Sequence, residues 1–153
     1  MTVVVVGLGH PDRGDDAVGS LVARRVAERA AGLSPAITIV EQADPAGLLD
    51  LWEGADLAVL VDAVRSDRPA GEVLVLDVTT APLPVGDWSA GGSHALSLAA
   101  AIELARVLGR LPGRLVLVGV EVRDAGLGVG VATVVTDAVE AATDAVLALL
   151  GGG

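Results

Sequence analysis

The chain has 153 residues, with 20 acidic against 10 basic side chains, a net charge of -10, and no cysteine. This negative charge argues against nucleic acid and anionic membranes as partners. The lack of cysteine excludes thiolate metal sites, disulfides and a cysteine nucleophile.

Apolar, β-branched runs predict strands that are buried on both faces. In chain order the predicted strands are Thr2–Val6, Ile37–Glu41, Leu57–Asp62, Glu72–Val78 and Arg114–Glu121. Between them, capping residues and glycines predict helices. These are Asp15–Ala31 with Asp15 as N-cap, Pro45–Glu53, His94–Leu108 with Ser93 as N-cap, and Thr133–Leu150.

The alternation of strands and helices predicts an α/β fold, a three-layer α/β/α sandwich. The link Ala63–Gly71 between the third and fourth strands is too short for a parallel crossover. We therefore expect these two strands to be antiparallel to each other. The length predicts a single domain over residues 1–153. No apolar run is long enough to span a membrane, and no charged leader precedes the first strand, so we expect a cytoplasmic protein.

Three polar residues follow strands or open a helix at the edge where α/β sheets bind ligands. They are Asp16 after the first strand, Asp62 at the end of the third, and His94 at a predicted helix start. Two carboxylates and an imidazole suit a divalent cation. The structural alternative is that each one caps a helix or loop.

Neighbouring residues have simpler interpretations. Asp15 is assigned to the helix cap, because adjacent residues on a helix point about 100° apart and one of the pair faces the cleft. We favour a solvated loop residue over a further ligand for His10. Trp88 lies in a long loop, where it either contacts a peptide or fills a gap under the loop. The turn Gly7–Gly9 is a weak dinucleotide signal, because the third glycine of that motif is missing.

Taken together, these segments resemble the hydrogenase maturation proteases, the endopeptidases that trim the C-terminus of the [NiFe]-hydrogenase large subunit. The resemblance covers nearly the whole chain. It rests on Gly7-Leu-Gly9 with Gly14-Asp-Asp-Ala-Val-Gly19, on Leu60-Val-Asp-Ala63, on Gly92-Ser-His94, and on Leu115-Val-Leu-Val-Gly-Val120. The chain departs from the family pattern at His10, at Ala17, and after Glu121.

The resemblance implies a five-stranded mixed sheet with one antiparallel strand, the fourth, in agreement with the short link. It also implies that Asp16, Asp62 and His94 recognise nickel. It implies a nickel-dependent endopeptidase that removes the C-terminal extension of a [NiFe]-hydrogenase large-subunit precursor after nickel insertion. The nickel belongs to the precursor, so the resting enzyme is expected to be metal-free. The metal either polarises the scissile carbonyl or activates water, or it serves only as a checkpoint while Asp16 or Asp62 is the general base of an aspartyl-type peptidase.

Two other functions stay open at this stage. One is a nucleotide-binding or small-molecule-binding α/β module that uses Gly7–Gly9. The other is an assembly chaperone that binds the nickel site without cutting. The expected partner is the hydrogenase large-subunit precursor, and a monomer is the default state.

Overall fold

The computed structural model describes residues 2–9, 17–32, 37–42, 44–84, 86–88, 97–122 and 133–151. The strands are β1 (Val3–Leu8), β2 (Ile37–Gln42), β3 (Leu57–Arg65), β4 (Val73–Asp77), β5 (Asp87–Trp88) and β6 (Arg114–Glu121). The helices are α1 (Val18–Arg29), the 3-10 turn η2 (Pro45–Gly47), α2 (Leu48–Trp52), α3 (Leu98–Leu108) and α4 (Thr133–Gly151).

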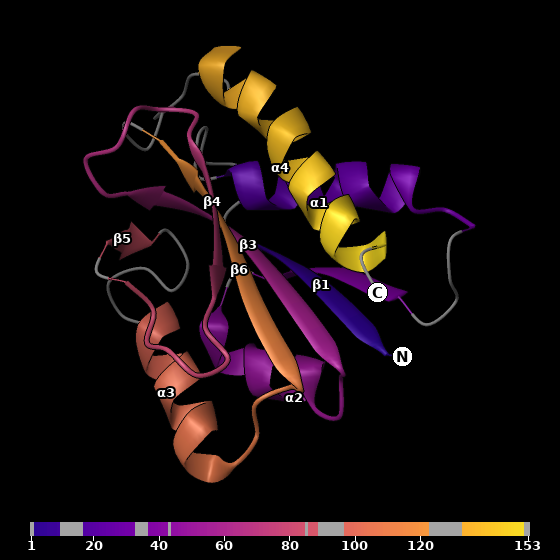
Figure 1. The fold of residues 1–153 in the computed structure, drawn as a ribbon, viewed down its shortest axis with the longest axis vertical. Coiled ribbons are helices and arrows are strands. Elements are labelled where there is room, and N and C mark those ends of the chain that lie inside the picture. The colour runs from indigo at the N-terminus through magenta and orange to yellow at the C-terminus, as the bar shows by residue number, and fades with distance from the viewer. Residues whose placement is uncertain are drawn as a thin grey trace.

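One mixed sheet forms the middle layer, with the strand order β2-β1-β3-β6-β4 (Figure 1). β1, β2, β3 and β6 run parallel, and β4 runs antiparallel to β6. The predicted α/β class, the five predicted strands and the antiparallel fourth strand are therefore confirmed. β5 pairs with β3 off the main path and adds a short antiparallel pairing that the sequence did not predict.

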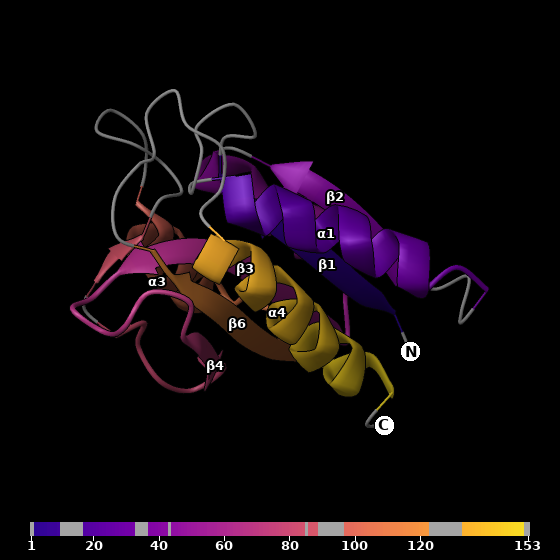
Figure 2. The ribbon, with the colours of Figure 1, turned by 90° about the horizontal axis from the view of Figure 1, so that it is seen from above.

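The helices form the two outer layers. α1 and α4 lie side by side over one face of the sheet (Figure 2), where Val22 of α1 and Ala142 of α4 pack on Val59 and Val118 of the central strands. α2 and α3 cover the other face with an apolar core that includes Leu60 and Trp52. Among the described residues, no helix has the length and apolar character needed to cross a bilayer.

Several predicted boundaries need correction. β3 continues to Arg65, so Asp62 lies inside the strand rather than at its end. α1 begins at Val18 with Ala17 as its N-cap, so the prediction that Asp15 caps this helix is wrong. α3 begins at Leu98, where the extended Ser97 accepts a hydrogen bond from the backbone N–H of Ala100. The predicted start of this helix at His94 is therefore also wrong.

Candidate active site at the carboxyl ends of the strands

The first turn of α1 lies in close contact with the carboxyl ends of β1 and β3. A Cβ on Gly19 would lie 2.6 Å from the carbonyl oxygen of Val61 and still closer to that of Leu8. A Cβ on Gly7 would lie 2.7 Å from the Cβ of Ala23. Only glycine fits at such an approach, so these two glycines set the helix against the strands. Gly7 thus has a packing role that needs no bound phosphate.

Asp62 occupies this same edge of the sheet. It follows Val61, the last β3 residue paired with β1, and it is fully buried. Its partner across the ladder in β6 is Gly119. Alternation along β3 puts Asp62 on the face that Leu60 shares with α2 and α3. A carboxylate inside a protein is tolerated where it is hydrogen-bonded, paired or bound to a cation, so this position favours a functional role.

Glu121 is a second buried carboxylate that sequence reasoning did not select. It ends β6 and is 2% exposed. It accepts hydrogen bonds from the backbone N–H and the hydroxyl of Ser66, at 2.8 and 2.6 Å. Its backbone carbonyl accepts from the N–H of Gly71, and its N–H donates to the carbonyl of Glu72. Glu121 therefore ties the end of β3 and the start of β4 to β6. The sequence signal was an acid at the end of an apolar run, the same signal that selected Asp62.

Trp88 is a partly exposed aromatic residue at this edge. It pairs with Val64 of β3, and its indole N–H donates to the carbonyl of Pro84 at 3.3 Å. The side chain packs against the apolar cluster under α2 and α3. The structure thus shows that Trp88 packs against the core, and contact with a peptide stays a prediction.

The remaining predicted site residues, Asp16 and His94, lie outside the described residues, as do Asp15 and His10. Within the described segments, no three His, Cys, Asp or Glu side chains gather in a way that could hold a metal ion. Of the predicted triad, the structure thus describes Asp62 alone, and the grouping of the three stays a prediction.

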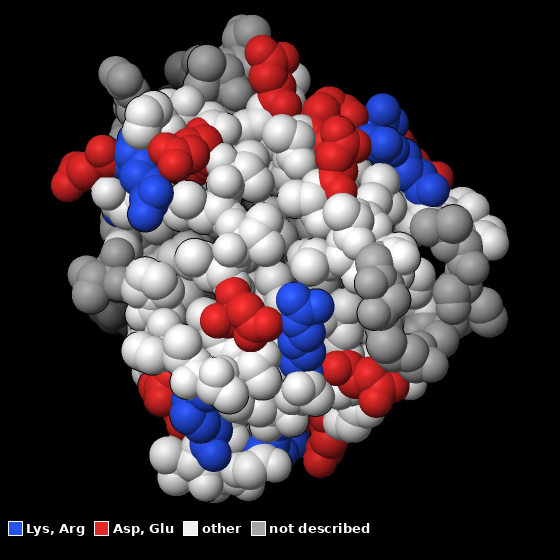
Figure 3. All heavy atoms as spheres, in the orientation of Figure 1, with Lys and Arg blue, Asp and Glu red and all other residues white. Residues whose placement is uncertain are grey.

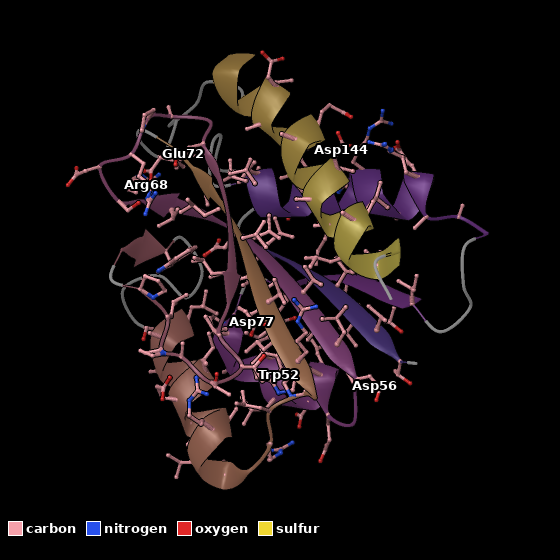
Figure 4. The ribbon with its side chains drawn as sticks, viewed as in Figure 1. Trp52, Asp56, Arg68, Glu72, Asp77 and Asp144 are labelled. Atoms are coloured by element: carbon pink, nitrogen blue, oxygen red, sulfur yellow. The ribbon has the colours of Figure 1, made fainter. Side chains whose placement is uncertain are left out.

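Charged groups elsewhere are organised as surface pairs. Arg25 and Arg29 of α1 bond to Glu140 and Asp144 of α4, and Asp144 is labelled in Figure 4. Acidic and basic side chains lie next to one another over this face of the molecule (Figure 3). Exposed pairs of this kind contribute little to stability and carry no chemistry by themselves.

One such pair lowers the pKa of a carboxyl group on β2. The Arg24 guanidinium donates to both oxygens of Glu41, at 3.0 and 2.9 Å. These hydrogen bonds hold the pKa of Glu41 below its ordinary value. Glu41 lies on the edge strand β2, which is separated from β3 by β1. The shift therefore reflects an ion pair that joins α1 to the sheet.

A groove between α1 and α4 has a volume of about 420 Å³ and lies on the face opposite Asp62. Its walls include Leu21, Arg25, Glu28 and Glu140. Three of these side chains are joined by ion pairs to one another. The groove therefore offers a surface between two helices rather than a set of catalytic groups.

Comparison with known proteins gives a consistent result. Residues 23–149 match the family model HycI, hydrogenase maturation protease. This range contains Asp62 and His94, and Asp16 precedes it. No curated protein sequence matches the chain.

Solved structures share the fold. The hydrogenase maturating endopeptidase HybD from Escherichia coli has a TM-score of 0.76 and 22% identity, over 98% of this chain and 92% of that chain. An endopeptidase from Escherichia coli has a TM-score of 0.75 and 24% identity, over 98% and 92%. The [NiFe] hydrogenase maturation protease HybD from Thermococcus kodakarensis has a TM-score of 0.71 and 20% identity, over 97% and 99%.

Proposed function

This chain belongs to the hydrogenase maturation protease family, and from that premise we propose that it removes the C-terminal extension of a [NiFe]-hydrogenase large-subunit precursor after nickel insertion. Membership makes it a hydrolase of the endopeptidase type. The proposal concerns its substrate, its use of nickel and its site residues. We further propose that it works as a monomer in the cytoplasm.

The observation that carries the proposal is the buried carboxylate of Asp62 at the carboxyl edge of the sheet. Two features of the chain support the other ligands. Asp16 immediately precedes Ala17, the N-cap residue of α1, and Gly19 of this helix packs on Val61, next to Asp62. His94 precedes α3, which covers the face of the sheet that carries Asp62.

In the proposed reaction the nickel ion arrives as part of the substrate. Asp16, Asp62 and His94 supply two carboxylates and an imidazole, a donor set suited to a divalent ion of borderline softness. The chain has no cysteine and two histidines, so a tightly held resident metal is not expected. Three weak ligands are enough to recognise an ion whose other ligands come from the precursor.

Two roles for the metal are compatible with these residues. The ion polarises the scissile carbonyl or activates water, and then no protein nucleophile is needed. Alternatively, it acts as a checkpoint, and Asp16 or Asp62 takes the proton from the attacking water. In both cases a precursor without nickel fails to dock productively.

The test compares matched precursor with and without nickel at equal protease concentration, followed by mass measurement of the large subunit. Nickel-loaded precursor should be shortened, and nickel-free precursor should keep its length. Equal shortening of both forms would contradict recognition of the nickel by the protease. Binding without shortening would indicate a chaperone. Asp15→Ser is the matched control for Asp16→Ser, because the two residues are adjacent and only Asp16 is assigned to the site.

A further inference from the structure

A glycine interrupts the aliphatic sequence of β6 at Gly119, between Val118 and Val120. Glycine inside a strand weakens it and commonly marks a place where another group comes close. Here that group is the indole of Trp88. A Cβ on Gly119 would lie 3.0 Å from both Cη2 and Cζ3 of the ring, closer than side chains normally pack. The missing side chain of Gly119 therefore provides the seat for Trp88.

The seat is directly beside Asp62. Gly119 is the residue that faces Asp62 across the β3–β6 ladder, and neighbouring strands lie about 4.8 Å apart. Both residues belong to the face under α2 and α3, and Trp88 itself pairs with Val64, two residues beyond Asp62. The indole thus lies over the sheet at the level of the Asp62 carboxylate.

The Trp88 side chain is only partly covered. It packs against the apolar cluster that includes Leu60 and Leu117, and the residue as a whole stays partly exposed. β5 contributes only Asp87 and Trp88, and the indole N–H donates to Pro84. A tryptophan held in this way offers a large rigid contact area whose ordering loses little entropy on binding, which is why tryptophan dominates many binding sites.

We propose that Trp88, seated on Gly119, forms a wall of the substrate cleft and packs against the peptide segment of the precursor that is brought to Asp62. This inference rests on the proposed function, because it requires a peptide at that carboxylate. Contact with the indole would hold the segment in register with Asp62, so that the scissile bond is presented in a reproducible position. Trp88 is thus a substrate-contact residue, and the proton and metal chemistry stays with the other groups.

Binding can be measured at Trp88 without any cleavage, because the chain has two tryptophans. The protein is labelled with 5-fluorotryptophan, and the two ¹⁹F signals are assigned with Trp52→Phe. Trp52, labelled in Figure 4, is the internal control: it is fully buried, and its indole N–H donates to the carbonyl of Arg110 at 2.8 Å.

Unlabelled nickel-loaded precursor is then added until co-elution in gel filtration confirms the complex. The Trp88 signal should shift, while the Trp52 signal shows only the broadening expected of a larger particle. An unchanged Trp88 signal in the confirmed complex would overturn the proposal. The proposed function is judged separately by whether the precursor is shortened, so the two can fail independently.

Kinetics give a second readout that a purely structural role would not move. Trp88→Ala should raise KM about tenfold with a smaller change in kcat, the size expected for a lost aromatic contact. Trp88→Phe should recover most of the loss, because a ring remains on the seat. Gly119→Ala should also raise KM, because the added methyl group displaces the ring. Folding is checked for each variant by circular dichroism. An unchanged KM in folded Trp88→Ala would mean that the indole only fills a gap.

Discussion

The two faces of the central strands β3 and β6 differ in how far along each strand the apolar residues continue. On the face under α1 and α4, β6 presents Val116, Val118 and Val120, all fully buried. On the opposite face the same strand begins with Leu115 and Leu117, continues with Gly119, and ends with a buried glutamate. The first face is apolar along the whole strand, and the second stops being apolar partway.

One face of β3 changes from an apolar to a polar residue at the same level of the sheet. Its face under α1 and α4 carries Val59, Val61 and Ala63, and its other face passes from Leu60 to Asp62. The register places Asp62 opposite Gly119, so both strands lack an aliphatic side chain at this level, and β3 then continues with the buried Val64. One face of the sheet is therefore apolar along its whole length, while the apolar core of the other is interrupted at Asp62 and Gly119, where polar chemistry has room.

The strongest test of this contrast changes one residue on each face. Asp62→Asn keeps the shape of the side chain and removes its charge, so the cleavage rate should fall about 10²- to 10⁴-fold, the range for loss of an acid–base group. Val118→Ala should leave the cleavage rate of the folded protein unchanged and lower the free energy of unfolding by about 2 kcal/mol.

The two variants are compared by precursor processing and by urea unfolding. Processing at the wild-type rate by Asp62→Asn would show that the carboxylate is neither a ligand nor a base. A folded Val118→Ala protein that fails to cleave would contradict the assignment of stability to one face and of cleavage to the other.

A smaller effect is expected where α1 meets the strands. Gly19→Ala gains helix propensity, but its methyl group would collide with the carbonyl oxygens of Leu8 and Val61. Because backbone atoms cannot move aside cheaply, the free energy of unfolding should fall by about 1 to 3 kcal/mol. Gly151→Ala is the control, since a methyl group there meets nothing within 4 Å. Equal urea midpoints for the two variants would mean that α1 is not held by this contact.

Much of this architecture was accessible from the sequence, because buried parallel strands are continuous apolar runs. The neighbours of the fourth strand could not be predicted from the sequence, because pairing between distant segments leaves no local pattern. β4 is joined to β3 by a short link, yet β6 lies between them. The apolar runs Val73–Leu76 and Leu115–Val118 look alike in the sequence, and only the structure shows that the first is the partly buried edge strand and the second is buried on both faces.

The errors in the start of α3, in β5 and in the choice of site residues each have a cause in the residues concerned. Both Ser93 and Ser97 could cap a helix, and the structure uses Ser97, because the buried stripe of Leu98, Ile102 and Ala105 begins just after it. β5 is too short for any periodic signal. At the candidate site, position and chemistry selected Asp62, but the same reasoning should have selected Glu121, which likewise ends a buried apolar run.

The smallest predicted effect concerns Asp77, an acid at the opposite edge of the sheet, where antiparallel β4 ends beside Val116 of β6. Asp77 is labelled in Figure 4. It accepts from the hydroxyl and the N–H of Thr79, at 2.6 and 3.0 Å, and from Arg114 at 3.0 Å. The Thr79 hydroxyl, the Thr79 N–H and then Arg114 lower the pKa of Asp77.

A carboxyl group with a lowered pKa in the folded state stabilises the protein above its unfolded pKa, near 4. That contribution is lost as the pH falls through the folded value. The side chain is 48% exposed, so we expect only a few tenths of a kcal/mol. Asp77→Asn should therefore be slightly less stable than wild type at pH 7, and the stability difference between the two unfolding curves should shrink as the pH falls below about 4, with precursor cleavage unchanged. A stability difference that does not change with pH would rule out the charge of Asp77 as its cause. A loss of cleavage would contradict the assignment of function to the Asp62 edge alone.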